Sequence, residues 1–211
     1  MSKKLLILGA GEHGKVVREV ALSITDNYLP RYSKVDFLDD YADNAIGKIK
    51  DLENYVGVYE ELFCGIGNNS IRKKLLEKAE ILGYEISILV HPTAYISSSA
   101  VIGKGTVVEP KAIVNTNSII GKGSVISVGA IIDYDVLVGK YVHVNAGAIC
   151  KAGSKIQESR KVNAGEIIPN FEKIIVGGNT MVNKEKIKKI LQIGTLVVGG
   201  AFVGTSVVAK I

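Results

Sequence analysis

The segment GAGEHG at residues 9–14 is the first part of the chain whose residue types could do chemistry. It lies between a short apolar run at residues 3–8 and a stretch with helical spacing of apolar residues at 15–23. Glycines at such a junction let backbone N–H groups at a helix N-terminus approach an anion closely. Gly11 and Gly14 are therefore candidates for binding a phosphate group. A tight strand-to-helix turn without a ligand is the other interpretation.

Polar residues also follow two further predicted strands. Asp39 and Asp40 end a strand at 34–38, and Gly67, Asn68 and Asn69 follow a strand at 61–66. Ligands bind beside the carboxyl ends of the strands in open parallel sheets, so these residues are candidates for ligand binding. A solvated turn at the aspartates and an asparagine N-cap at 68–69 are the alternatives.

Side chains that could bind a metal are few. The histidines are His13, His91 and His143, and the two cysteines, Cys64 and Cys150, lack metal-ligand spacing. A zinc-dependent β-helical lyase needs several histidine ligands, so no metal cofactor is expected. The cysteines are interpreted as reduced, buried thiols of a cytoplasmic protein.

Two sequence rhythms divide the chain. Residues 1–90 alternate strand-like and helix-like segments, with a helix at 69–82 opened by Asn69 or Ser70 and a closing strand at 86–90. This order predicts a small, mostly parallel α/β domain. A nicotinamide dehydrogenase, the other class of protein that uses G-x-G-x-x-G, would need a larger sheet than these residues supply.

From residue 91 onward, aliphatic residues recur every six positions. Each six-residue unit is expected to form one face of a triangular coil with its aliphatic side chain inward, which indicates a parallel β-helix. A β-sandwich would instead alternate with period two. Gly103, Gly121 and Gly139 directly follow three of the aliphatics and are expected to relieve strain at the corners. The repeating positions are Ile96, Ile102, Val108, Val114, Ile120, Ile126, Ile132, Val138, Val144, Cys150, Ile156, Val162 and Ile168.

The repeat weakens after Ile168. One further step is expected at Val176 and Val182, and the apolar tail is expected to form an irregular cap on the β-helix. The predicted domains are therefore residues 1–90 and 91–211.

Composition excludes several classes of protein. The net charge of +5 comes mostly from lysines scattered among acidic residues, so no nucleic-acid partner is expected, although a phosphate-rich small molecule would suit it. No apolar run reaches the ~20 residues of a membrane span. The apolar run near the N-terminus is too short for a signal peptide, and we expect a cytoplasmic protein.

Four motifs, taken together and in order, resemble one known family: LILGAGEHGKVV, VDFLDD, GIGNNSIRKKL, and LVHPTAYIS leading into the repeat. The chain resembles the sialic acid O-acetyltransferase and bacillosamine-pathway amino-sugar N-acetyltransferase family over nearly its whole length. The resemblance implies a Rossmann-like domain, a left-handed β-helix, a homotrimer, acetyl-CoA between subunits and a UDP-linked amino sugar. It also implies that the glycine turn and His13 meet the diphosphate, and that Asp39 and Asp40 bind the uracil or ribose.

The resemblance also implies a site for the acyl donor. Coils around Gly147 and Gly153, and the step at Gly177 and Gly178, match the family's donor-binding coils. His143, in the sequence YVHV, corresponds to a family histidine near the thioester. A histidine among valines is also compatible with a purely structural role.

The chain departs from its family at the general base. Family members carry histidine between two acidic residues, whereas this sequence reads Asp133-Tyr134-Asp135. A phenol is a poor base at neutral pH because it ordinarily ionises near ~10. Three interpretations follow: an amine acceptor that attacks unaided and loses its proton to water or an aspartate, a sugar O-acetyltransferase in which His143 is the base, or a nucleotide-sugar-binding protein with little catalysis.

We favour the amine acceptor, because attack by a hydroxyl depends on general-base assistance worth about 10²–10⁴-fold. The predicted function is acetyl-CoA-dependent N-acylation of a UDP-linked amino sugar. The residues placed at the catalytic position are His143, Tyr134, Asp133 and Asp135.

Overall fold

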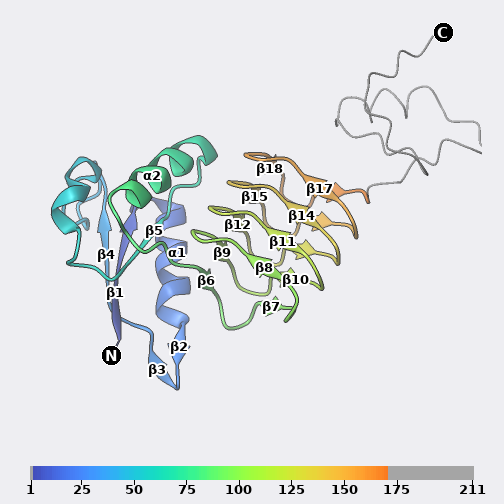
Figure 1. Cartoon of the computed structure of the whole chain (residues 1–211), viewed down its shortest axis with the longest axis horizontal. Helices are drawn as coiled ribbons and strands as arrows, with labels where there is room; N and C mark the ends of the chain where they lie inside the picture. Colours follow the sequence, from blue (N-terminus) through green and yellow to red (C-terminus); the bar gives the residue numbers. More distant parts are fainter. Residues whose placement is uncertain (1, 171–211) are drawn as a thin grey trace, which may run out of the picture. The chain divides into compact units, whose positions relative to one another are not determined.

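The computed structural model describes residues 2–170, which belong to one compact unit, Met1–Asn170. A small α/β part comes first and a β-helix follows it along the chain (Figure 1). The predicted step at Val176 and Val182 and the predicted cap lie outside the described residues. The division into domains at residues 1–90 and 91–211 stays a prediction.

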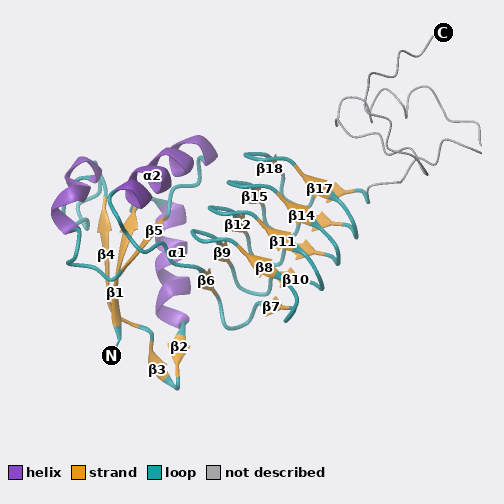
Figure 2. Ribbon diagram, viewed as in Figure 1, coloured by secondary structure: helices purple, strands orange, loops and turns teal. Residues whose placement is uncertain are grey.

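The α/β part is built on a three-stranded parallel sheet (Figure 2). Its strand order is β4 (Tyr32–Leu38), β1 (Lys3–Leu8) and β5 (Glu61–Cys64). The apolar end of β1 is buried on both faces, as expected for a strand between two helices. Helix α1 (Glu12–Ser23) packs on the face that carries Leu5 and Ile7, and helix α2 (Asn69–Ile81) packs on the opposite face.

Three short elements complete this part. Strands β2 (Thr25–Asp26) and β3 (Leu29–Pro30) form an antiparallel hairpin, and residues 49–55 form a 3-10 helix, η1 (Ile49–Tyr55). Neither segment was predicted from the sequence. The predicted strand at 86–90 is wrong as a single strand: Ile86 makes an isolated bridge to Leu62, whereas β6 (Leu89–Val90) pairs with the first coil of the β-helix.

The β-helix consists of two-residue strands stacked in three parallel sheets. Each strand pairs with the one 18 residues further along, for example Ile113 with Ile131 and Ile131 with Ile149. The β6 stack holds β6, β9 (Val107–Val108), β12 (Val125–Ile126), β15 (His143–Val144) and β18 (Lys161–Val162). The β7 stack holds β7 (Tyr95–Ile96), β10 (Ile113–Val114), β13 (Ile131–Ile132), β16 (Ile149–Cys150) and β19 (Ile167–Ile168). The β8 stack holds β8 (Val101–Ile102), β11 (Ile119–Ile120), β14 (Leu137–Val138) and β17 (Lys155–Ile156).

The predicted aliphatic positions form the interior of the coils. Residues 108–168 of the six-residue series are buried in one cluster, and Ile96 and Ile102 are partly buried against it at the first coil. The small residues two positions earlier, such as Ala112 and Ala130, are also buried. The hexapeptide repeat therefore predicted the core of the β-helix correctly.

Glycines of the β-helix serve two purposes. Gly147 and Gly153 have positive φ angles of 63° and 70°, in the left-handed region that favours glycine. The expectation that Gly103, Gly121 and Gly139 relieve backbone strain is wrong. Their φ angles are not positive, and a Cβ on Gly121 would lie 2.6 Å from the backbone of Gly139 in the next coil. These three glycines are therefore required by close contact between coils.

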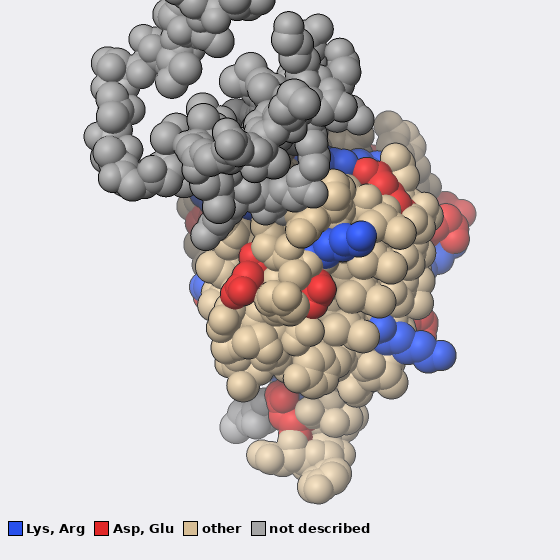
Figure 3. Space-filling model, turned by 90° about the vertical axis from the view of Figure 1, so that its right-hand side faces the viewer, with Lys and Arg blue, Asp and Glu red and all other residues tan. Residues whose placement is uncertain are grey.

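The three faces of the β-helix differ in what covers them. The outward residues Leu89, Val107 and Val125 of the β6 stack are buried against the α/β part. The β8 stack instead exposes Val101, Ile119 and Leu137. A view from the β-helix side shows charged side chains singly or in small groups on a largely uncharged surface (Figure 3). Within residues 2–170, no helix is long and apolar enough to cross a membrane.

Candidate functional site

The glycine turn is shaped by close packing at one end and is open at the other. A Cβ on Gly14 would lie 2.1 Å from the carbonyl oxygen of Gly9, and a Cβ on Gly65 would lie 2.8 Å from the Cα of Gly14. These glycines let the turn before α1 pack on the turn after β5. Gly11, the N-cap of α1, has no atom within 4 Å of its Cβ position and no side-chain cap. The helix N-terminus is thus available to an anion.

Asp39 and Asp40 do different things. Asp39 accepts hydrogen bonds from Ala10 N–H at 2.8 Å, Tyr41 N–H at 2.8 Å and Ala42 N–H at 3.0 Å. The bond from Ala10 is the largest cause of the lowered pKa of Asp39. Asp39 therefore ties the glycine turn to the end of β4, and its carboxylate is already occupied.

Asp40 is held less tightly and faces a cavity. Its Oδ1 accepts one hydrogen bond from Ile49 N–H at 3.1 Å. The cavity is about 330 Å³ in volume and has a mostly apolar wall. Its lining residues are Asp39, Asp40, Tyr41, Ile49, Ile66, Ile71 and Leu75. This is a size and lining that a nucleotide base could fill, with Asp40 as the polar group at its edge.

The asparagines after β5 are structural in the described chain. Asn68 is the N-cap of α2, rather than Asn69 or Ser70 as expected, and its Oδ1 accepts hydrogen bonds from Ser70 N–H and Ile71 N–H. Asn69 donates from Nδ2 to Ser159 O at 2.9 Å and so fastens α2 to the β-helix. Gly67 lies beside His13: a Cβ added to Gly67 would lie 4.0 Å from the Cβ of His13.

A buried arginine joins the two parts of the molecule. Arg72, in α2, is fully buried and donates hydrogen bonds to Ile66 O, Gly67 O, Gly123 O, Tyr141 O and the side chain of Asn69. No acidic side chain lies among these partners. Burial lowers the pKa of the guanidinium to about 10. Arg72 could not be predicted as a buried residue from the sequence, because a basic residue in an amphipathic helix ordinarily faces solvent.

The α/β part and the β-helix also meet at two histidines, His13 and His143. His13 lies in the first turn of α1 and His143 opens β15, yet their ring centroids are 5.9 Å apart. His143 Nε2 lies 3.1 Å from Ser127 Oγ, and His13 Nδ1 lies 3.7 Å from Glu109 Oε1. His13 Nε2 and His143 Nδ1 are buried and have no hydrogen-bond partner of normal geometry in the described part of the chain.

Both imidazoles are held in the neutral form. Burial is the largest cause in each case and lowers the pKa of His13 and of His143 to about 4. The positive charge of Arg72 acts in the same direction on both rings, while the backbone of Gly67 partly opposes the shift at His143. At neutral pH these rings can exchange hydrogen bonds without carrying charge.

Tyr134 lies at another corner of the coil. It follows β13 of the β7 stack, its side chain is among the exposed aromatic groups, and its backbone oxygen accepts a hydrogen bond from Gly153 N–H at 3.0 Å. Asp133 accepts a hydrogen bond from the Tyr134 N–H, and Asp135 accepts one from Asn117 Nδ2 at 3.2 Å. Both neighbouring carboxylates therefore make local contacts, and Tyr134 belongs to a different stack from His143.

Comparison with known proteins places the chain in a family. Residues 4–79 match the PglD N-terminal domain. The acetyltransferase domain of PglB from Neisseria gonorrhoeae FA1090 has 35% sequence identity and a TM-score of 0.74, covering 79% of this chain and 82% of that one. The chain belongs to the PglD family of acetyltransferases. The predicted family and the predicted left-handed β-helix are thus confirmed.

Three relatives of this PglD-family chain are similar to it, two of them with structures that contain bound ligands. The same PglB domain in complex with acetyl coenzyme A has 34% identity and a TM-score of 0.74. A mutant of perosamine N-acetyltransferase from Caulobacter crescentus, in complex with CoA and GDP-perosamine, has 25% identity and a TM-score of 0.68, covering 79% of this chain and 89% of that one. UDP-N-acetylbacillosamine N-acetyltransferase from Bacillus subtilis (strain 168) is 32% identical over 112 residues. That match covers 50% of this chain and 51% of the relative, so the chain spans about half the length of this curated relative.

The predicted donor residues of this PglD-family chain are only partly described. Gly147 and Gly153 lie at coil corners with no atom within 4 Å of their Cβ positions, whereas Gly177 and Gly178 lie outside the described residues. Within residues 2–170, no group of three or more His, Cys, Asp or Glu side chains could hold a metal ion.

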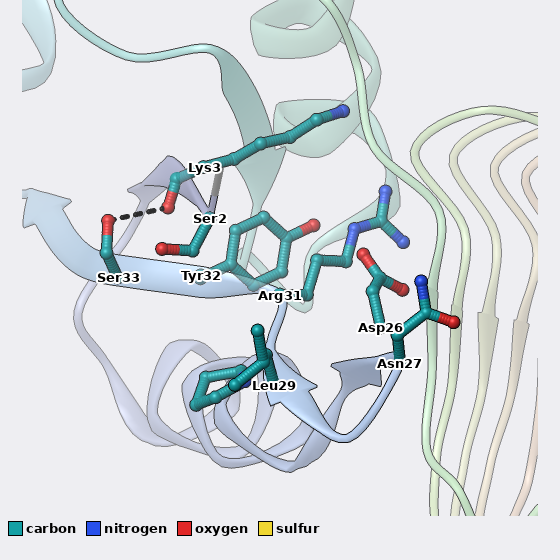
Figure 4. Close-up of a pocket in the computed structure, with 9 residues that line it drawn as sticks. Ser2, Lys3, Asp26, Asn27, Leu29, Arg31, Tyr32 and Ser33 are labelled. Atoms are coloured by element: carbon teal, nitrogen blue, oxygen red, sulfur yellow. Dashed lines mark hydrogen bonds between the residues drawn. The ribbon is translucent and has the colours of Figure 1, made fainter.

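A second cavity lies at the opposite end of the small sheet, where β1 and β4 begin (Figure 4). It is about 530 Å³ in volume. Lys3, Arg31 and the hydroxyl of Tyr32 all donate hydrogen bonds to the buried carboxylate of Glu61, which offsets one of the two positive charges. None of the predicted site residues lines this cavity.

Proposed function

We propose that this protein transfers an acetyl group from acetyl-CoA to the amino group of a nucleotide-linked sugar. The observation that carries the proposal is the meeting of two parts of the fold at His13 and His143, with ring centroids 5.9 Å apart. One histidine stands at an anion-binding helix N-terminus and the other on the coil that corresponds to the family's donor site. The acetyl-CoA and GDP-perosamine complexes of the relatives support both halves of the reaction.

The nucleotide would bind along the carboxyl edge of the small sheet. The diphosphate would lie at the N-terminus of α1, where Gly11 leaves open space and the helix dipole favours negative charge. The base would occupy the cavity beside Asp40, whose carboxylate makes only one described hydrogen bond. We favour a uridine diphosphate, as in the name of the Bacillus subtilis relative, and GDP-perosamine in the Caulobacter complex makes GDP the alternative to test.

The acyl donor would lie against the β-helix. Ser127 orients the ring of His143 through the 3.1 Å contact to Nε2, so that the neutral imidazole can hydrogen-bond the thioester. The corners at Gly147 and Gly153 have open space beside their backbones, which allows a ligand chain to approach. Gly177 and Gly178 belong to the same proposed donor site.

An N-acyl transfer fits the groups at hand. The amine nitrogen attacks the carbonyl carbon of the thioester, the C–S bond breaks, and the thiolate takes up a proton. The proton that the nitrogen loses passes to water, Asp133 or Asp135. His143 is a weak base because burial lowers its pKa to about 4, and this disfavours an O-acetyltransferase that relies on His143.

A homotrimer is part of this proposal. The outward side chains Val101, Ile119 and Leu137 form an exposed aliphatic stripe along the β8 stack. A stripe of this kind on a rigid face suits contact with another copy of the chain, and a closed ring of three copies would bring Tyr134 of one subunit near the donor site of the next. Sedimentation should give three times the chain mass of 22.5 kDa.

A cytoplasmic location is also proposed. Cys64 and Cys150 are both free and buried, which supports a reducing compartment, as does the use of acetyl-CoA. A nucleotide-sugar-binding protein with little turnover is the second candidate function, and Tyr134 at the base position is the observation that favours it.

The test is release of free thiol from acetyl-CoA in the presence of UDP- or GDP-linked 4-amino sugars and their 4-hydroxy counterparts. Thiol release with an amino sugar alone is the expected result. Release with the hydroxy sugar would show that a base is present and would refute unaided N-acylation. Binding of the nucleotide sugar without thiol release would favour the binding protein.

A further inference from the structure

The carboxylate of Glu109 is the one buried acidic group beside the proposed diphosphate site among the described residues. Glu109 follows β9, and its side chain is 8% exposed. Its Oε2 accepts a hydrogen bond from Val128 N–H at 2.9 Å. Its Oε1 faces His13 Nδ1 at 3.7 Å, beyond normal hydrogen-bond distance. Burial of such a carboxylate is unfavourable unless it gains a charged partner, and within residues 2–170 none of the groups paired with it is cationic while His13 is neutral.

The groups around His13 come from three elements besides its own helix. His143 lies on β15, Arg72 on α2, and Glu109 at the corner after β9. Burial, His143 and the Arg72 charge all lower the pKa of His13, in that order of effect. Glu109 is the one described neighbour whose charge would favour the protonated ring. Burial also raises the pKa of Glu109, so the ionised carboxylate is held at a cost, and the pair is one proton short of a buried ion pair.

We propose that Glu109 is a positioning residue for His13, and that binding of a nucleoside diphosphate transfers one proton from solvent to the His13–Glu109 pair. This inference rests on the proposed nucleotide-binding function. The ligand brings two or more negative charges to the N-terminus of α1, in the same helical turn as His13. The protonated ring then forms an ion pair with Glu109 and faces the diphosphate, which holds the α/β part against the β-helix.

Proton uptake makes binding depend on pH with a defined sign. The free protein has a neutral His13 above pH 4, because its pKa is lowered to about 4. The bound ligand raises this pKa, so affinity is greatest below pH 4, falls as pH rises from the free-state to the bound-state pKa, and levels off above the bound-state value. The slope of log Kd against pH should approach one proton in that window.

Calorimetry of UDP and GDP binding at pH 7, in two buffers of different ionisation enthalpy, tests the inference. Wild-type protein should take up roughly 0.5–1 proton per chain. Glu109→Gln keeps the size of the side chain and an acceptor for Val128 N–H, and should reduce uptake to near zero while weakening binding about tenfold. Glu85→Gln is the matched control, since it removes an exposed carboxylate that pairs with Lys104, and it should leave uptake unchanged.

Four results would overturn the inference. Binding of UDP or GDP without proton uptake would refute it while leaving the proposed function intact. Undiminished uptake in Glu109→Gln would remove Glu109 from the role, and uptake that persists in His13→Asn but disappears in His143→Asn would assign the proton to the other ring. Failure of both nucleotides to bind folded protein would refute this inference and the nucleotide part of the proposed function together.

Discussion

The family resemblance implies a histidine at the position of Tyr134, so the variant Tyr134→His restores the side chain expected there. The site can accept the change, because the Tyr134 side chain is 52% exposed at a coil corner and packs in no core cluster. Asp133 and Asp135 flank it, and each makes hydrogen bonds that do not involve the phenol ring. The substitution should therefore fold normally and add a base.

The size of the effect follows from the exposure of the site. Solvent contact keeps an introduced imidazole near its ordinary pKa of ~6.5, so about three quarters of it is basic at pH 7, against roughly 0.1% of an ordinary phenol. The basic form of the imidazole is therefore about 760 times more abundant than that of the phenol. A phenolate is the stronger base by about 3.5 pKa units, and with a Brønsted coefficient near ~0.5 this reduces the advantage of the imidazole about 60-fold. An imidazole would thus exceed even a phenolate base by about tenfold, and because the phenol takes no part in the proposed reaction, about tenfold is the smallest gain expected if proton removal limits the rate.

The assay is thiol release from acetyl-CoA at saturating amino sugar, measured from pH 5.5 to 9. Tyr134→His should raise kcat at least about tenfold at pH 7 and move the acidic limb of the pH profile toward ~6.5. Tyr134→Phe is the matched control, because it removes the hydroxyl but adds no base, and should leave kcat within about twofold of wild type.

Two results would refute this reasoning. An unchanged rate and pH profile in folded Tyr134→His would show that proton removal is not assisted at this corner. A loss of activity of more than tenfold in Tyr134→Phe would show that the phenol itself takes part in the reaction.

Other consequences of the structure can be measured directly. His13 and His143 have pKa values lowered to about 4, whereas an unfolded histidine titrates near ~6.5, so the unfolded chain binds more protons in this window. The unfolding free energy should therefore fall by a few kcal/mol from pH 6.5 to 4, allowing for solvent screening, and urea unfolding should show a smaller loss for His13→Asn. Asp39→Ala should destabilise the fold by about 1–3 kcal/mol, while Asp40→Asn should keep the melting temperature and weaken nucleotide binding in calorimetry. Arg72→Met should lower the unfolding free energy by roughly 3–5 kcal/mol, because several buried carbonyl oxygens lose their donor, with Arg72→Lys restoring only part of it in urea titrations.

The β-helix could be predicted from the sequence because each coil requires apolar side chains at the same inward positions. An inward aliphatic such as Val114 has one kind of buried environment, the interior of the stacked coils, which recurs every six residues. The same logic failed at Gly121, where the requirement comes from the backbone of the next coil rather than from the φ angle of the glycine. The family resemblance, by contrast, was carried by the order of four motifs and not by any one of them.

The candidate site was predicted in part. The residues after the strands were expected at one edge of the sheet. Their residue types, however, do not show which of these side chains already make hydrogen bonds within the chain and which are free to bind a ligand. Asp39 proves to cap a turn and Asn68 to cap helix α2, and the contact between His13 and His143 depends on how the α/β part packs on the β6 stack. Arg72 and Glu109 were missed for the same reason, since a charged residue is buried only by parts of the chain distant in sequence.

The pairing of every strand with its neighbour 18 residues away has a consequence for how this chain can change in length. Removing one residue between β13 and β15 would shift the register of all later strands, so that inward side chains would no longer face the interior of the coils. Removing six would move each later strand to the next face, so that His143 would no longer point toward the α/β part. Only a change of 18 residues leaves each face with its own neighbours. Length variation among natural versions of this β-helix should therefore come in whole coils, or be confined to loops that bulge out at the corners.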